Sequence, residues 1–244
     1  MDYAAFCQYR HLLSNASDLK EIKSICEDLC KYVHFDYFCL AICDKVTLVS
    51  PKVIYLSNFP RQTLDFFANL KQFGTDPLLG YAFSNTTSIL WDDLFNNIEK
   101  SKNGKDYFST LLSQGLNNGF SVPINSLNGQ VALISLASKN HDIEHKIISD
   151  ALIATEIFSR YLIDSFNRID KIENPKVNNL TERELECVFW ACEGKTAWEM
   201  SHIVGVTERT INFHLTSVIK KLGASNRQHA VAKAVLYGLV KPRA

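Results

Sequence analysis

The residues most suited to chemistry lie near the C-terminal end, in the segment 208–222. At helical spacing, the side opposite its apolar stripe carries donors, acceptors and cations: Arg209, Asn212, Phe213, Thr216, Ser217 and Lys220. An Asn amide can pair with an adenine edge, and a Thr hydroxyl can contact a base edge or a thymine methyl. Lys220 and Lys221 suit phosphate contact. The pattern predicts a nucleic-acid contact. A merely solvated helix face is the alternative, against which the outward Phe213 argues.

The spacing of histidine and cysteine favours neither an enzyme nor a metal site. The pairs Cys26/Cys30 and Cys39/Cys43 lack the further His or Cys partner that a zinc finger needs. No Ser/His/Asp or Cys/His set has a recognisable spacing, and three histidines fall near the C-terminal segment: His202, His214 and His229. We therefore expect no catalytic residues, no cofactor and reduced, mostly buried thiols, with a metal site as the weaker alternative.

The elements that position the C-terminal segment are four short helices, predicted at 182–193, 197–204, 208–222 and 226–237. Capping boxes indicate three of the starts, and a plain N-cap indicates the other: Thr181–Glu184, Thr196–Glu199, Ser225–Gln228 and Thr207. Glycines stand where left-handed helix ends and a tight turn are expected: Gly194, Gly205, Gly223 and Gly238. Each helix has an apolar stripe, so the four can share one core.

The short second helix, the turn at Gly205 and the longer third helix form a helix-turn-helix pattern, in which the third helix enters the major groove of DNA. The segment from Lys176 onward holds ten Lys or Arg against six Asp or Glu, although the whole chain is neutral. This modest basic excess is consistent with phosphate contact without establishing it.

Several motifs in this segment resemble the LuxR-type DNA-binding domain: Leu180–Glu184, Gly194–Thr196, Thr210–His214, Lys221–Ala224 and Asn226–Ala230. The resemblance covers residues 180–240 without gaps. It implies that Asn212 and Thr216 read bases, and that four other residues lie near the DNA backbone: Lys195, Thr196, His214 and Lys220. Arg209, Thr210, Phe213 and Lys221 complete the expected DNA-binding set.

The preceding residues predict a separate, larger domain. Residues 166–179 are polar, contain Pro175 and indicate a linker between domains 1–165 and 180–244. A helix at about 18–32 and a strand at 37–42 differ from the regular strand–helix alternation of a phosphorylated receiver domain, which argues against that class. The N-terminus has no signal-peptide pattern, and no apolar run is long enough to span a bilayer.

This first domain resembles the autoinducer-binding domain of LuxR quorum-sensing regulators. Scattered motifs carry the resemblance: Phe35–Tyr37, Asn58–Pro60, Asp76-Pro77, Trp91–Asp93, Gly115–Pro123 and Leu136–Ser138. It implies an α-β-α sandwich with an antiparallel sheet that encloses a small apolar cavity for an amphipathic ligand. With the helical C-terminal domain, the expected fold class is α+β.

The resemblance also implies a set of ligand-binding residues. Asp76 matches an aspartate that accepts from the ligand amide, and Trp91 matches a tryptophan beside the ligand head. Ser121 and Ser135 stand where a hydroxyl is frequent, and Pro77 and Gly119 match structural positions. Three positions depart from the family: Thr63 replaces the tryptophan that donates to the lactone carbonyl, Phe59 the tyrosine that donates to the acyl carbonyl, and Phe67 a further tyrosine.

These departures weaken the expected fit of an acyl-homoserine lactone. An unpaired buried carbonyl costs roughly 1–3 kcal/mol, and two such losses lower affinity by about a hundredfold or more. We expect a regulator that acts in the bacterial cytoplasm, on the nucleoid when bound to DNA, as a homodimer on a palindromic operator. Its small-molecule signal differs from a standard lactone. The open alternatives are a ligand-independent regulator with a filled pocket, an orphan (solo) member without its own synthase, and an enzyme carrying a DNA-binding domain.

Overall fold

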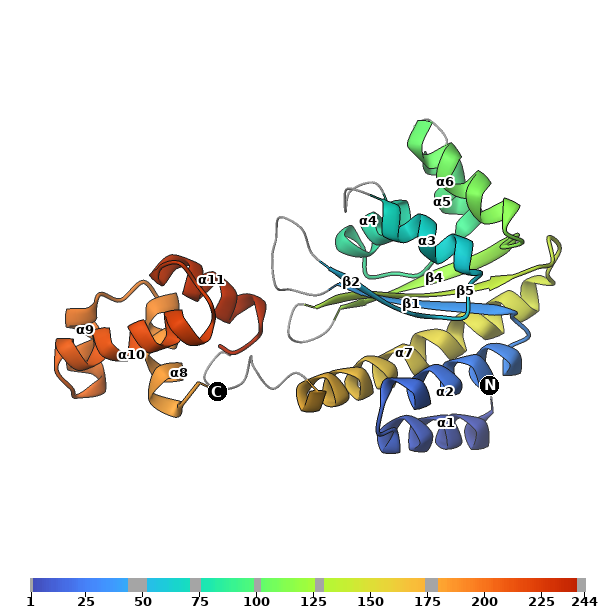
Figure 1. Cartoon of the computed structure of the whole chain (residues 1–244). Coiled ribbons are helices and arrows are strands. Elements are labelled where there is room, and N and C mark those ends of the chain that lie inside the picture. The colour runs from blue at the N-terminus through green and yellow to red at the C-terminus, as the bar shows by residue number, and fades with distance from the viewer. Residues whose placement is uncertain are drawn as a thin grey trace. The chain divides into compact units, whose positions relative to one another are not determined.

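The structure, a computed structural model, describes residues 2–43, 52–70, 76–98, 102–125, 130–173 and 180–240. The chain divides into two compact units, and the boundary between them along the chain falls between Ile169 and Asp170. Figure 1 shows the N-terminal unit as a sheet between two helical layers and the C-terminal unit as a group of helices. The α+β class and the α-β-α sandwich expected from the sequence are confirmed.

The N-terminal unit is built around one antiparallel sheet. In the described residues its strands run in the order β2-β1-β5-β4-β3. Their bounds are β1 Tyr37–Cys43, β2 Val53–Ser57, β3 Ile89–Leu90, β4 Asn118–Asn125 and β5 Val131–Ser138. Helices α1 Tyr3–Asn15, α2 Leu19–Tyr32 and α7 His145–Glu173 cover one face. Helices α3 Arg61–Asn69, α4 Pro77–Ser84, α5 Trp91–Ile98 and α6 Lys102–Ser113 cover the other (Figure 1).

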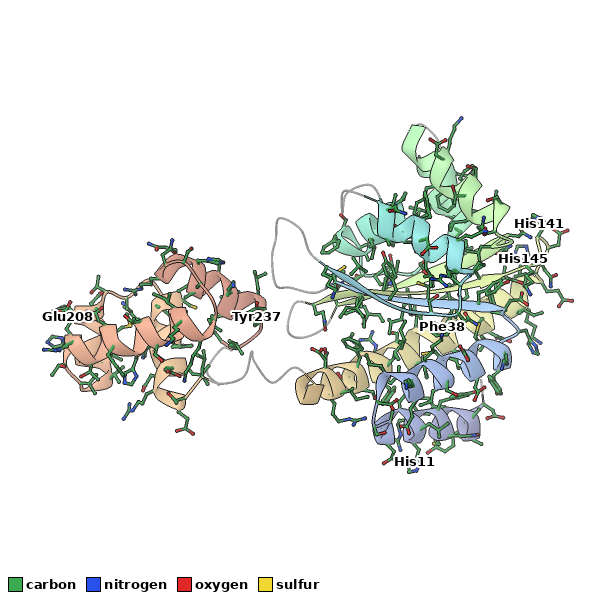
Figure 2. The ribbon with its side chains drawn as sticks, in the orientation of Figure 1. His11, Phe38, His141, His145, Glu208 and Tyr237 are labelled. Carbon is green, nitrogen blue, oxygen red and sulfur yellow. The ribbon has the colours of Figure 1, made fainter. Side chains whose placement is uncertain are left out.

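Because side chains alternate along a strand, the sheet separates two apolar cores. We call them the lower core, on the α1, α2 and α7 side, and the upper core, on the α3–α6 side. On β1 the even positions Phe38, Leu40 and Ile42 enter the lower core, and Cys39, Ala41 and Cys43 enter the upper core. Phe38 is labelled on the sheet in Figure 2. The upper core is the one that contains the expected ligand-binding residues.

The predicted linker begins too early. Helix α7 continues to Glu173, and Phe166 and Ile169 are buried in the lower core. Phe158, Leu162, Phe166 and Ile169 recur at helical spacing, so the polar residues among them face outward on a helix that continues. The Arg168 guanidinium, in the same segment, donates to the carbonyls of Leu13 and Ala16. The rest of the predicted linker, 174–179, lies outside the described residues.

The C-terminal unit contains the four expected helices: α8 Glu182–Cys192, α9 Ala197–Val204, α10 Glu208–Lys221 and α11 Arg227–Leu236. Both capping boxes predicted at Thr181 and Thr196 are present, and Thr207 caps α10. The box predicted at Ser225 is wrong, because Asn226 caps α11 and its side chain accepts from the His229 amide. All four glycines at the helix ends have positive φ, from 56° to 77°. Glu208, at the start of α10, is labelled in Figure 2.

Candidate functional site

A row of small polar side chains crosses the sheet on its upper-core face. Strand register aligns Ser57 of β2 with Cys39 of β1, Cys39 with Ser135 of β5, and Ser135 with Ser121 of β4. All four are buried. Burial raises the pKa of the Cys39 thiol to about 12, so this group is a neutral thiol. The sequence prediction contained Ser121 and Ser135, and the structure places them side by side.

Trp91 closes one end of this row. Its indole Nε1 donates to the Ser121 hydroxyl at 2.9 Å, and the Ser121 and Ser135 hydroxyls are 2.7 Å apart. When Ser121 in turn donates to Ser135, the proton of Ser135 is available to a further acceptor. Gly119 makes this arrangement possible: a Cβ there would lie 2.6 Å from the Leu136 carbonyl oxygen and 2.9 Å from the Trp91 ring. Trp91 and Gly119 therefore position the polar row.

Asp76 is a buried carboxylate at the start of α4. Its Oδ1 accepts from the amides of Leu78 and Leu79 at 3.0 and 3.1 Å, and Pro77 occupies the first turn of the helix. Only 5% of Asp76 is exposed. Burial raises the pKa of its carboxyl, against the lowering effects of the Leu79 amide, the Tyr107 hydroxyl and the Leu78 amide. Asp76 is thus a helix cap and also an incompletely compensated charge.

Two further buried hydroxyls in this unit lack a partner. Thr63 on α3 and Tyr107 on α6 are almost wholly enclosed, and neither hydroxyl oxygen makes a hydrogen bond in the described part of the chain. The Tyr107 hydroxyl lies near enough to Asp76 to affect its pKa, although the pair lacks normal hydrogen-bond geometry. Burial and the Asp76 charge raise the pKa of Tyr107 well above its usual value, so this phenol keeps its proton.

Aromatic rings fill the space around these polar groups. Phe67 stacks with Tyr55 and with Tyr107, each at a centroid distance of 5.8 Å. Phe59 contacts Phe67 at 6.4 Å and Trp91 at 6.5 Å. The structure therefore brings all seven expected ligand-binding residues to the upper-core side of the sheet: Phe59, Thr63, Phe67, Asp76, Trp91, Ser121 and Ser135.

The C-terminal unit presents a second candidate surface on α10. Ile211, Leu215 and Val218 are buried, as the apolar stripe predicts. The opposite side is exposed and consists of Arg209, Asn212, Phe213, Thr216 and Lys220, with His214 half-buried. Phe213 is 70% exposed and contacts the His214 ring at 5.8 Å.

Lys221 and Thr210 of the predicted DNA-binding set make side-chain contacts that hold the helices of this unit. Lys221 Nζ donates to Glu184 at 2.7 Å, and Ser217 donates to the other Glu184 oxygen at 2.6 Å. Thr210 pairs with the Thr207 hydroxyl at 2.8 Å at the start of α10. These contacts give Lys221 and Thr210 structural roles that exist without DNA.

Glu184 is the centre of the first of these contacts. It also accepts from the Thr181 amide at 2.7 Å as part of its capping box. Burial opposes ionisation of Glu184, but the bonds from Lys221, Ser217 and the Thr181 amide outweigh it and lower its pKa to about 2. The start of α8 is therefore fixed to the end of α10 by a fully compensated carboxylate.

Lys195 and Thr196 of the predicted set lie between α8 and α9. Lys195 follows α8, its Nζ lies 3.9 Å from Glu199, and its carbonyl accepts from the Arg227 guanidinium. Thr196 caps α9 by accepting from the Glu199 amide at 3.2 Å. Thr216, within α10, is exposed and its hydroxyl donates to the Asn212 carbonyl at 2.8 Å.

Two family models match the chain. Residues 18–164 match the model of the autoinducer binding domain, and residues 178–234 match that of the bacterial regulatory proteins of the luxR family. The chain belongs to the LuxR family. It is 32% identical over 221 residues to the transcriptional activator protein LuxR of Aliivibrio fischeri, with 90% of this chain and 88% of that protein covered. As a member of this family the chain is a DNA-binding transcription regulator and not an enzyme.

Solved structures show the same fold. Escherichia coli SdiA aligns with 97% of this chain and 100% of its own at a TM-score of 0.83 and 22% identity. A structure of SdiA in complex with octanoyl-rac-glycerol aligns with 100% of both chains, also at 0.83, with 24% identity. None of the helices in the described ranges combines the length and apolar character that crossing a bilayer requires. In the same ranges no group of three or more His, Cys, Asp or Glu side chains is placed to hold a metal ion.

Four residues on the upper-core side of the sheet were not predicted from the sequence as parts of the candidate site: Cys39, Tyr55, Ser57 and Tyr107. Cys39 and Ser57 belong to the polar row, which depends on strand register between segments distant in sequence. Tyr107 lies on α6, where its period relative to Phe108 and Leu111 predicts burial but not proximity to Asp76. The sequence signal that could have indicated Tyr107 is the presence of a tyrosine on an otherwise apolar helical face.

Proposed function

We propose that the chain is a transcription factor whose DNA binding is controlled by a small amphipathic molecule held in the upper core. The observation that carries this proposal is the buried Asp76 carboxylate in a unit whose Thr63 and Tyr107 hydroxyls are also buried and make no hydrogen bond of normal geometry within the described residues. Leaving such groups unpaired costs free energy, and a ligand with matching polar atoms recovers it. The family match over residues 18–164 supports the same role.

The proposed signal differs from a standard acyl-homoserine lactone. Phe59 has no hydrogen-bond donor for an acyl carbonyl, and its ring packs against Trp91 and Phe67. The Thr63 hydroxyl can donate, but the threonine side chain reaches less far than the tryptophan that the family carries at this position. The SdiA structure that contains octanoyl-rac-glycerol supports the idea that this fold can hold an acyl compound other than a lactone.

The DNA-binding role is proposed for the exposed face of α10, with Asn212 and Thr216 reading bases and Lys220 contacting phosphate. Arg209, Phe213 and His214 border this face, while Lys195 and Thr196 lie beyond it at the start of α9. Because one short helix reads few bases, a homodimer on a palindromic operator is the expected functional unit. The regulator would act in the cytoplasm, where the bacterial chromosome lies.

One observation favours a second candidate, a regulator that works without ligand. Phe67 stacks with Tyr55 and Tyr107, and Phe59 contacts Phe67, so rings occupy much of the upper core. In that case the aromatic rings would fill the space in the upper core that a ligand would otherwise occupy.

Mass spectrometry of small molecules retained by the purified chain separates the two candidates. We expect a stoichiometric amphipathic molecule, released on denaturation, whose removal changes affinity for an operator selected from random DNA. A stable, ligand-free protein with unchanged DNA affinity would contradict the proposal and favour the second candidate.

The DNA face has its own test, with two neighbouring substitutions on α10. Asn212→Ala should weaken binding to the selected operator by about tenfold to a hundredfold and leave non-specific binding unchanged. Lys220→Ala should weaken binding to all sequences and reduce the salt dependence by about one phosphate contact. Equal effects of the two substitutions on every sequence would show that the reading face is placed wrongly.

A further inference from the structure

Phe213 is the most exposed large apolar side chain among the described residues of the C-terminal unit, at 70%. Within those residues its ring meets one other ring, that of His214, with 5.8 Å between the centroids. A single exposed apolar side chain is common on protein surfaces and by itself indicates nothing. The informative features are the position of Phe213 on α10 and the side chains around it.

Phe213 points almost directly away from the core of its unit. Ile211, Leu215 and Val218 are the buried residues of α10. At about 100° per residue, Phe213 lies within roughly 15° of the direction opposite their mean. It also belongs to the N-terminal half of α10, which runs from Glu208 to Lys221. When a recognition helix lies in the major groove, its N-terminal part makes the contacts to base edges.

The neighbours of Phe213 on this side of α10 are cations. Arg209 precedes it by one helical turn and Lys220 follows it by two, so the three side chains lie along one line. Both cations are exposed, and neither makes an ion pair within the part of the chain that the structure describes. The exposed acid Glu208 is turned about 140° around the helix from Phe213. The charge along this line is therefore complementary to DNA, whose backbone is a polyanion.

A phenyl ring on such a line has no hydrogen bond to offer a base. The edges of the base pairs in the major groove present donors and acceptors and one apolar group, the C5-methyl of thymine. An apolar side chain can therefore distinguish thymine from the other bases by contact with this methyl group.

We propose that Phe213 is a specificity-determining residue that reads a thymine of the operator through its C5-methyl group. This inference rests on the proposed DNA-binding role of α10 and deepens it by naming the group that is read. Asn212 and Thr216 read bases through polar atoms, whereas Phe213 adds a contact that depends on apolar surface alone.

Replacement of thymine by uracil in the selected operator tests this, because uracil forms the same base pair and lacks only the methyl group. Each thymine is replaced in turn, and fluorescence anisotropy measures the dissociation constant of the full chain for each duplex. For at least one position we expect the wild type to bind about fourfold more weakly, the effect of burying one methyl group. At that position Phe213→Ala should show a change of less than about 1.5-fold.

The effect of Phe213→Ala on unmodified DNA gives a second measurement. It should weaken binding to the operator by about fourfold or more and leave the affinity for non-specific DNA unchanged. Phe213 is exposed and alanine has the higher helix propensity, so the unfolding temperature of Phe213→Ala should equal or exceed that of the wild type.

Two further variants serve as controls. Phe213→Leu keeps an apolar side chain and should keep a loss of about twofold or more at the same uracil position. Ile203→Ala removes an exposed apolar side chain of α9 and should keep the full fourfold loss of the wild type.

Three results would overturn the inference: no thymine whose replacement by uracil weakens binding of the wild type, a uracil effect that Phe213→Ala retains in full, or equal weakening by Phe213→Ala on operator and non-specific DNA. If Asn212→Ala still weakens only operator binding in any of these cases, the proposed function stands and only this inference is lost. A full chain that selects no operator would lose the proposed function as well.

Discussion

Among the described residues, each of the two units buries one carboxylate at the start of a helix, and the surroundings of the two carboxylates differ. Glu184 in the DNA-binding unit accepts from Lys221, Ser217 and the Thr181 amide, and its pKa falls to about 2. Asp76 in the N-terminal unit accepts from two backbone amides of its own helix, and burial raises its pKa. The first arrangement is complete and holds two helices together. In the second arrangement, the lowering effects of the hydrogen-bond donors do not offset burial.

The comparison teaches that burial of a charge does not by itself indicate function. Two buried carboxylates of similar exposure differ in how far the protein compensates them, and the less compensated one lies among the proposed ligand-binding residues.

Lys221→Met should destabilise the DNA-binding unit by about 2–4 kcal/mol, because it leaves Glu184 buried without its cation. Lys220→Met, one residue earlier and exposed, should change stability by less than about 0.5 kcal/mol. Chemical denaturation of the full chain, followed by a probe of the C-terminal transition, measures both. Equal stability of the two variants would mean that the Lys221–Glu184 contact is a surface pair of little value.

Gly119→Ala should destabilise the N-terminal unit by about 1–3 kcal/mol, because the added Cβ overlaps the Leu136 carbonyl and the Trp91 ring. The displaced indole should also lose its bond to Ser121, which would appear as a shift in tryptophan fluorescence. Gly80→Ala is the control, since nothing lies within 4 Å of a Cβ there. An unchanged stability of Gly119→Ala would show that the polar row tolerates movement of Trp91.

Acid should affect the two units in opposite directions through these carboxylates. The lowered pKa of Glu184 means that its contribution is fully present above its usual value of 4.5 and is lost as pH falls towards about 2. The raised pKa of Asp76 means that its ionised form costs stability above its usual value of 3.8, and that protonation relieves this cost as pH falls. Unfolding curves measured between about pH 2 and 7 test both directions. Glu184→Gln and Asp76→Asn serve as references, because each lacks one of the two titrating carboxyls. A loss of Asp76-dependent stability on acidification would contradict them.

The smallest effect is expected at Thr63. Thr63→Val removes a buried hydroxyl without a partner and keeps the shape of the side chain, so the ligand-free protein should gain up to about 1 kcal/mol. Thermal unfolding of the ligand-free protein measures this gain. A clear loss of stability would indicate that the Thr63 hydroxyl has a partner in the folded protein.

Much of the fold could be predicted because its determinants are local. Thr181, Thr196 and Thr207 cap helices through atoms three residues away, and the glycines at helix ends follow from backbone sterics alone. The expected ligand-binding residues came from a resemblance, and the structure brings them together without testing their roles.

The parts that sequence could not predict depend on contacts between distant segments. The partners of Phe166 and Arg168 are the lower core and the end of α1, so composition alone suggested a linker. Tyr107 on α6 meets Phe67 on α3 through a ring contact between residues 40 positions apart in sequence. The engagement of Lys221 with Glu184 likewise depends on a contact between residues 37 positions apart in sequence.

The most direct test of the central claim is the pair of matched amide substitutions Asp76→Asn and Glu184→Gln, measured by chemical denaturation of the ligand-free protein at neutral pH. Asn still caps α4, so Asp76→Asn should leave stability unchanged or raise it, while Glu184→Gln should lower it by about 2 kcal/mol or more. A loss from Asp76→Asn as large as the loss from Glu184→Gln would contradict the account, because it would show that Asp76 is already compensated by the protein alone.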